Sequence, residues 1–170
     1  FKRYNDKDPE MKSIEGNILL IDDLAHLGWS DAIAASLWGS EYIHNIENDK
    51  TENGLKISER KSRDSRYFLR SISNPDNKKE GEFINALKAN LKDYLTKKID
   101  IVLLDLRLRR VEDEKSDSPE KTSGIEILKI IKDMNAAIPV IMLTASRRAR
   151  NMEKVYDLGA DGYFIKERNT

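Results

Sequence analysis

The stretch Ile101-Val102-Leu103-Leu104-Asp105 is an unbroken apolar run that ends in a carboxylate. Short runs of Val, Ile and Leu are typical of strands that are buried on both faces of a parallel sheet. Three further runs have the same form and also end in polar side chains: Ile18-Leu19-Leu20-Ile21 before Asp22 and Asp23, Val140-Ile141-Met142-Leu143 before Thr144, and Tyr163-Phe164-Ile165 before Lys166. The four runs predict the central strands of a parallel sheet, the first over about residues 17–22.

The polar ends of these runs are expected to meet at one edge of the sheet, because ligands bind at the carboxyl ends of the strands in open α/β sheets. Three carboxylates, a hydroxyl and an ammonium would lie together there. Carboxylates that close repel one another unless a cation sits among them, and Mg²⁺ takes oxygen ligands while keeping several waters. The pattern therefore predicts a site that holds a divalent cation and handles a phosphoryl group, with Asp105 as the nucleophile.

Helical periodicity appears between the apolar runs. The expected helices cover about 30–40, Phe83–Leu95, a segment that Gly124 opens, and Arg147–Leu158. Ser30 is a plausible N-cap of the first helix, and Gly159 fits the C′ position of the last. Strands that alternate with helices predict a doubly wound α/β sheet of five parallel strands in the order 2-1-3-4-5, with right-handed crossovers.

The length of 170 residues predicts one domain over 17–170, preceded by a polar lead-in at 1–16. The alternating pattern fails between about residues 40 and 80. The segment Glu41–Ile46 could extend the first helix or begin a strand, Leu55–Ser58 could be a short strand, and Tyr67–Leu69 another element. The segment Arg109–Thr122 is charged and loop-like.

Composition excludes several classes of function. The formal net charge is zero, with 30 basic and 30 acidic residues, so no global charge points to nucleic acid or a membrane surface. Cysteine is absent, which excludes disulfides and thiolate metal sites. The apolar runs are too short to span a bilayer, and no signal-peptide pattern opens the chain. We expect a soluble cytoplasmic protein.

The Asp22-Asp23 pair, the lone Asp105, Thr144 followed by a small residue, and the late Lys166 resemble the receiver domain of two-component response regulators, of the chemotaxis-regulator type. The resemblance runs from about Asn17 to Lys166, with a poor match over 40–80 that implies an insertion before the central strand. It implies a phosphoacceptor switch that catalyses only its own phosphorylation and dephosphorylation. A histidine kinase or phosphotransfer protein would be the donor, and the downstream partner or output domain is unknown.

The same resemblance implies the metal ligands. Asp23 and Asp105 would bind Mg²⁺ directly, Asp22 would act mainly through water, and the backbone carbonyl of Arg107 would supply a further oxygen.

The resemblance also implies the groups that contact the phosphoryl group. Lys166 would pair with one phosphoryl oxygen, and the Thr144 hydroxyl would donate to another. Tyr163 matches an aromatic position that changes rotamer in the family, although a buried strand aromatic is an equally good interpretation. Glu167 stands where the family usually has Pro; a cis peptide there would cost ~3 kcal/mol without Pro, so Lys166 could be held differently.

Two other functions are compatible with these residues. The chain could be a receiver-like interaction module that is not phosphorylated in use. A phosphatase or phosphotransferase with an aspartyl intermediate would need a second carboxylate soon after the nucleophile, and Leu106-Arg107-Leu108 supplies none.

Arginines surround the predicted site in the sequence. They are Arg107, Arg109 and Arg110 after one strand, and Arg147, Arg148 and Arg150 after another. They form either a solvated face balanced by the acidic segment 112–114, or an electropositive surround for an anionic donor or partner.

Receivers end with a helix after the lysine strand, and this chain stops at Thr170. The final helix of the fold is thus expected to be missing, which would leave apolar surface at 163–165 partly uncovered. The helix could lie in a longer native protein, the insertion could cover this face, or another chain could do so by self-association. The first residue is not Met, which favours a piece of a longer protein.

Overall fold

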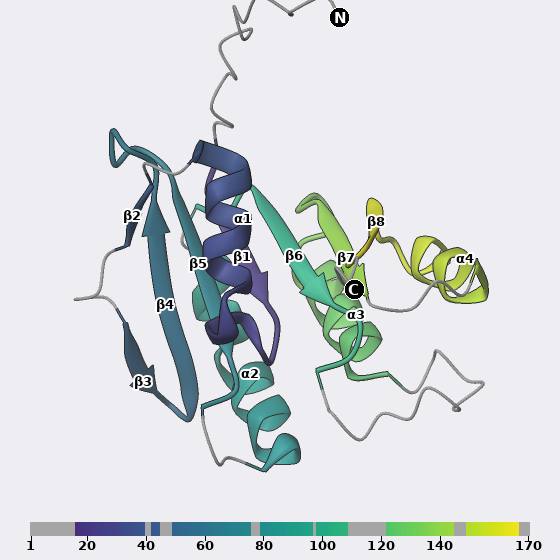
Figure 1. Cartoon of the computed structure of the whole chain (residues 1–170). Coiled ribbons are helices and arrows are strands. Elements are labelled where there is room, and N and C mark those ends of the chain that lie inside the picture. The colour runs from purple at the N-terminus through teal and green to yellow at the C-terminus, as the bar shows by residue number, and fades with distance from the viewer. Residues whose placement is uncertain are drawn as a thin grey trace, which may run out of the picture.

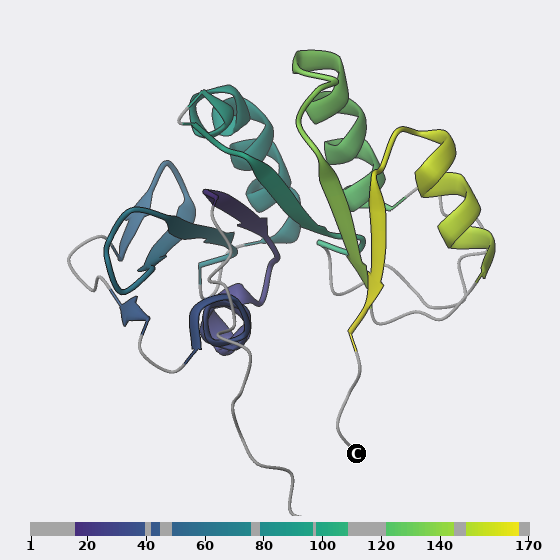
Figure 2. The same cartoon turned by 90° about the horizontal axis from the view of Figure 1, so that it is seen from above.

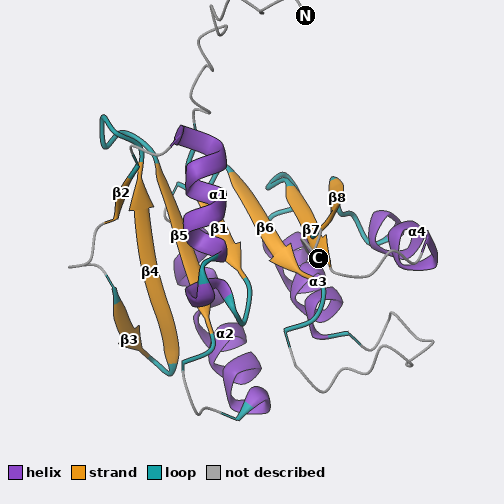
Figure 3. Cartoon of the chain, viewed as in Figure 1, coloured by secondary structure: helices purple, strands orange, loops and turns teal. Residues whose placement is uncertain are grey.

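A central sheet carries helices on both faces in the structure of the chain, a computed structural model (Figure 1). The structure describes residues 16–39, 42–44, 49–75, 79–96, 98–108, 122–144 and 149–166. Its elements, coloured by type in Figure 3, are β1 (Ile18–Ile21), η1 (Ala25–Leu27), α1 (Trp29–Trp38), β2 (Ile43–His44), β3 (Lys50–Glu52), β4 (Leu55–Lys61), β5 (Phe68–Ser73), α2 (Glu80–Leu95), β6 (Ile101–Asp105), α3 (Ser123–Met134), β7 (Val140–Thr144), α4 (Ala149–Asp157) and β8 (Gly162–Ile165).

The parallel part of the sheet has the predicted strand order. Strands β5, β1, β6, β7 and β8 are neighbours in that order and all run parallel. Numbered along the chain, these five strands follow the order 2-1-3-4-5. Strand β1 is buried throughout: Leu19 and Ile21 contribute to one hydrophobic cluster, and Ile18 and Leu20 to the other. The prediction of strands buried on both faces is confirmed for β1, whereas β8 is only half-buried and exposes Phe164.

The two faces of the sheet differ in cover, as the view from above shows (Figure 2). Helices α2, α3 and α4 pack on the larger cluster through residues such as Phe83, Leu128 and Val155. Helix α1 packs on the smaller cluster through Ala34, and the short helix η1 adds Ala25 to it. Within the described residues no helix follows β8, and Phe164 is 56% exposed. No helix in this part of the chain is long and apolar enough to cross a membrane.

An apolar groove of about 300 Å³ lies on the α1 face of the sheet. The residues that line it come from α1, from strands β6, β7 and β8, and from the position after β8: Trp29, Ala32, Ile33, Ser36, Leu37, Leu103, Ile141, Leu143, Phe164 and Lys166. The prediction that apolar surface near β8 would be partly uncovered is therefore correct for Phe164.

The sheet is larger than predicted, because three antiparallel strands extend it beyond β5. Strand β4 pairs with β5 over Lys56–Lys61, and β2 and β3 pair with opposite ends of β4. Asn53 and Gly54 join β3 to β4, and both have positive φ, 50° and 77°. Two consecutive positive φ values are what a two-residue type I′ hairpin requires, and Asn-Gly is its strongest sequence signal. The expectation of five strands overlooked this dipeptide.

The prediction that Ser30 caps the first helix was wrong. Helix α1 begins one residue earlier, after Gly28, whose φ of 111° follows the short helix η1. Ser30 instead turns inward, where its hydroxyl donates to the carbonyl of Ala25 at 3.1 Å and lies 2.8 Å from the Ser71 hydroxyl. At the other end of the chain, Gly159 has φ of 91° just after α4, as its predicted C′ role requires.

Candidate functional site

Strand register brings the predicted site residues to one edge of the sheet. Ile21 pairs with Leu104, so Asp22 follows β1 where Asp105 ends β6. Asp105 in turn pairs with Leu143, the residue before Thr144. Thr144 pairs with Ile165, and Lys166 follows directly. The polar ends of four strands therefore lie together, as their positions after apolar runs predicted.

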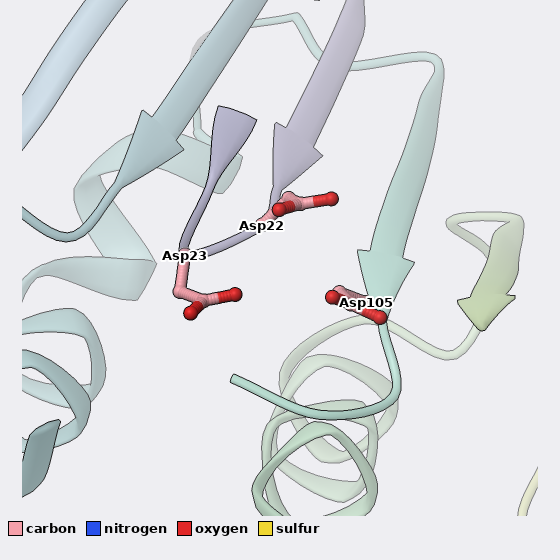
Figure 4. Close-up of side chains that lie close together, drawn as sticks. All are labelled: Asp22, Asp23 and Asp105. Carbon is pink, nitrogen blue, oxygen red and sulfur yellow. The ribbon is translucent and has the colours of Figure 1, made fainter. Parts of the chain in front are cut away.

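The three carboxylates form one buried cluster (Figure 4). Asp22, Asp23 and Asp105 are 1%, 5% and 9% exposed. One carboxylate oxygen from each lies within 4.8 Å of the others. Three carboxylates that close cannot all be ionised cheaply without positive charge among them.

Lys166 supplies positive charge to the cluster. Its Nζ lies 2.5 Å from Oδ2 of Asp22 and 3.0 Å from Oδ2 of Asp105. Burial disfavours the ammonium, but the Asp105 and Asp22 carboxylates outweigh burial and raise the pKa of Lys166. Lys166 is therefore charged and directed at the carboxylates. It reaches them although the next residue in the sequence is Glu167 and not Pro.

The surroundings of Asp105 disfavour its ionisation. Burial, which has the largest influence, and the Asp22 carboxylate raise the pKa of Asp105 from 3.8 to about 6, although the Lys166 ammonium acts in the opposite direction. Its Oδ1 accepts a long hydrogen bond, 3.5 Å, from the Arg107 N–H. A buried carboxylate with a raised pKa gains from a second cation or from covalent modification.

The donor set fits a divalent cation. Ligands about 2.1 Å from Mg²⁺ lie at most about 4.2 Å apart, so the three carboxylates need only a small movement to share one ion. Both oxygens of Asp22 already have partners, because Oδ1 accepts from the Leu24 N–H at 2.9 Å and Oδ2 contacts Lys166. Both oxygens of Asp22 are therefore engaged within the protein in this structure.

Thr144 and Tyr163 lie next to the cluster and contact each other. Thr144 is fully buried at the end of β7, and its carbonyl accepts from the Lys166 N–H at 2.6 Å. Tyr163 is half-buried against the larger hydrophobic cluster. Burial raises the pKa of Tyr163, while a hydrogen bond with the Thr144 side chain lowers it. The two residues are therefore linked in this structure.

Two residues of α3 support the site, and neither was predicted from the sequence to do so. A Cβ on Gly124 would lie 2.3 Å from the Asp105 carbonyl oxygen and 2.5 Å from that of Leu106, so only glycine lets α3 begin so close to the strand end. The hydroxyl of Ser123 accepts from the Leu108 N–H at 3.0 Å. The local sequence does not predict the close contact of Gly124, because the carbonyls of Asp105 and Leu106 belong to residues nineteen and eighteen positions earlier in the chain.

Most of the predicted arginine rim lies outside the described residues. Only Arg107 is described with its side chain; Arg109, Arg110, Arg147 and Arg148 are not, nor is the side chain of Arg150. The same holds for Ala145, the small residue after Thr144.

Sequence comparison identifies the family. The model of the response regulator receiver domain matches residues 82–170, just over half of the chain. That match includes Asp105, Thr144 and Lys166. No curated protein sequence matches the chain.

Solved structures of receivers share the fold. A two-component response regulator of the LuxR family from Aurantimonas sp. matches with a TM-score of 0.51 at 19% identity, covering 92% of this chain and 77% of that chain. The receiver domain of HemR from Leptospira biflexa matches at 0.50 and 19% identity, covering 91% and 85%. NtrX from Brucella abortus matches at 0.50 and 16% identity, covering 92% of this chain and 24% of that larger one. The family model and the parallel sheet, with its carboxylates at one edge, agree: the chain belongs to the response regulator receiver domain family, a family of signalling modules.

Proposed function

We propose that this receiver is a phosphoacceptor switch of a two-component pathway, phosphorylated on Asp105 with Mg²⁺. The observation that carries the proposal is the buried cluster of Asp22, Asp23 and Asp105 with Lys166 at one edge of the parallel sheet. The cluster combines a nucleophile, cation ligands and a fixed positive charge, which are the groups that phosphoryl transfer needs.

The step is a displacement at phosphorus. A carboxylate oxygen of Asp105 attacks the phosphoryl group of the donor and forms a new O–P bond. The bond to the leaving group breaks, and the leaving group departs with its electron pair. Because burial raises the pKa of Asp105 to about 6, the residue is largely a carboxylate at neutral pH and can act without a general base.

The residues that would hold Mg²⁺ are Asp23 and Asp105 directly, Asp22 mainly through water, and Arg107 through its backbone carbonyl. When bound, the ion would neutralise charge on the phosphoryl oxygens. The close approach of all three carboxylates supports this assignment.

Lys166 and Thr144 would contact the phosphoryl group. The Lys166 ammonium already lies 3.0 Å from Asp105, so it can pair with a phosphoryl oxygen after a short movement. The Thr144 hydroxyl would donate to another oxygen, which would break its present link with Tyr163. Release of Tyr163 from that contact is how phosphorylation would reach the surface of the domain.

A histidine kinase or a phosphotransfer protein is the proposed donor, and the downstream partner or output domain is not identified. We also propose that residues 17–170 form the receiver, with the antiparallel strands β2, β3 and β4 as the segment inserted within 40–80. Those strands extend the sheet on the edge away from Lys166, so they leave the proposed site accessible.

The test is phosphorylation with a small donor. The protein is incubated with acetyl phosphate and Mg²⁺, and its intact mass is followed. We expect the mass of one phosphoryl group to be added as an acid-stable, base-labile adduct in wild type and to be absent in Asp105→Asn. The matched control is Asp100→Asn, because Asp100 lies just before the opposite end of the same strand and accepts from the Asn17 N–H; it should be phosphorylated normally.

A wild type that takes up no phosphoryl group from any donor would favour the unphosphorylated interaction module instead. An adduct that persists in Asp105→Asn would move the nucleophile elsewhere.

A further inference from the structure

The ammonium of Lys166 has an aromatic partner as well as its two carboxylates. Its Nζ lies 5.1 Å from the centroid of the Trp29 ring, within the distance at which a cation is attracted to the face of an indole. An ammonium has three N–H groups, and Asp22 and Asp105 account for two contacts. The Trp29 ring is thus a third, uncharged partner.

Trp29 is positioned by the segment that follows β1, whereas Lys166 follows β8. The chain leaves β1 through Asp22 and Asp23, forms the short helix η1, and turns at Gly28 with φ of 111°. Trp29 is then the first residue of α1. It lines the apolar groove together with Lys166 and Phe164.

An uncharged partner matters because the carboxylates that contact Lys166 also take part in cation binding and phosphorylation in the proposed reaction. Asp22 and Asp105 would turn toward a divalent cation, and Asp105 would become esterified. Both changes weaken the contacts that hold Lys166, whose four-carbon stem is flexible. The attraction to Trp29 does not depend on either change, so the ring can keep the ammonium in place when the carboxylates are engaged.

We propose that Trp29 is a positioning residue for phosphoryl transfer, which holds the Lys166 ammonium where the phosphoryl oxygens arrive. The proposal rests on the proposed function of Asp105 and adds a role outside the strand-end residues. Trp29 does not touch the reacting atoms itself; it acts through Lys166.

The first arm of the test measures the contact without any phosphoryl donor. The chain has two tryptophans, so Trp38→Phe leaves Trp29 as the single tryptophan. Its fluorescence then reports on the contact with Lys166. Lys166→Met in this background should shift the emission of Trp29. Lys88→Met is the control, because Lys88 pairs with Glu126 between α2 and α3. Emission that is the same in both variants would overturn the proposal.

The second arm measures the initial rate of phosphoryl incorporation from acetyl phosphate. Trp29→Leu should slow incorporation about tenfold, equivalent to about 1.4 kcal/mol in the barrier, with the Mg²⁺ concentration for half-maximal rate unchanged. Trp29→Phe retains an aromatic face and should recover most of the rate. A Trp29→Leu rate equal to wild type, or a Phe variant no better than Leu, would overturn the role.

A double variant separates positioning from general structural damage. If Trp29 acts through Lys166, then adding Trp29→Leu to Lys166→Met should slow incorporation little further, because the two changes remove one arrangement. Fully additive losses would show that Trp29 acts elsewhere. Wild type that incorporates nothing would refute the phosphoacceptor function and this role together, whereas normal incorporation in both wild type and Trp29→Leu would refute this role alone.

Discussion

Two groups of charged side chains among the described residues are built differently. The carboxylate site consists of Asp22, Asp23, Asp105 and Lys166. The ion-pair group consists of Glu59 and Arg70, which face each other across β4 and β5, and of Arg60 with Asp31 on α1. The site has three carboxylates against one ammonium, whereas the ion-pair group has equal numbers of each sign.

The contacts in the two groups differ as much as the charges. Arg60 binds Asp31 with two hydrogen bonds, at 2.7 and 3.2 Å, and Arg70 binds Glu59 at 2.8 Å. In the carboxylate site, by contrast, burial holds the pKa of Asp105 at about 6 despite Lys166. Matched charges therefore serve the fold, while a surplus of one sign marks a site that awaits a cation or a chemical change.

The largest effect is expected in the ion-pair group. Glu59→Gln should lower the free energy of unfolding by about 3 kcal/mol, because it leaves the charge of Arg70 partly buried without its counter-ion. Urea denaturation at neutral pH measures this. Glu52→Gln is the control: Glu52 pairs with Lys50 at the exposed strand β3, and such pairs contribute less than about 1 kcal/mol. Equal losses in both variants would contradict the comparison.

The next effect concerns pH in metal-free buffer. The folded-state pKa of Asp105 is raised to about 6 from 3.8, so between these values the folded state holds a proton that the unfolded state has released. The contribution of Asp105 to stability therefore falls as pH rises from about 4 to 6, by roughly 3 kcal/mol in total. Unfolding free energies measured across this range should show the fall in wild type relative to Asp105→Asn. Parallel curves for the two proteins would refute it.

Asp105→Asn should itself stabilise the protein at neutral pH without metal, by about 2 kcal/mol, because it removes one of three crowded carboxylates while Asp22 still pairs with Lys166. Thermal unfolding measures this as a higher melting temperature. The sign is opposite to that of Glu59→Gln although both changes neutralise a buried acid. A lower melting temperature for Asp105→Asn would mean that the site is as balanced as the ion-pair group.

The smallest effect is that of Mg²⁺. The ion should raise the melting temperature of wild type modestly, because few protein ligands and several waters would hold it. At concentrations near tenfold above the dissociation constant it should add about 1.4 kcal/mol to the free energy of unfolding. Asp23→Ala should abolish the rise, and Arg107→Ala should retain it, since only the backbone carbonyl of Arg107 is proposed to bind. An equal response of wild type and Asp23→Ala would remove Asp23 from the ligand set.

Much of the parallel core could be predicted because its signal is local. An apolar run such as Ile18–Ile21 indicates a strand buried on both faces wherever it pairs, and the spacing of Phe83, Leu87 and Leu91 indicates a helix with one apolar face. The antiparallel extension carried a local signal too, Asn53-Gly54, which the failed alternation around it obscured. The role of Ser30 had no such signal, because its partner Ser71 lies in a strand forty-one residues away.

By itself the sequence determined which side chains stand at the ends of the strands, and hence that carboxylates, a hydroxyl and an ammonium belong to one edge of the sheet. Only the tertiary structure decided how those groups act on one another. Asp22, Asp105 and Lys166 come from separate strands, Trp29 comes from a helix, and their distances depend on register and packing. Charge interactions and burial are set by what surrounds a group in space, so the high pKa of Asp105 and the aromatic contact of Lys166 arise only when the sheet has assembled.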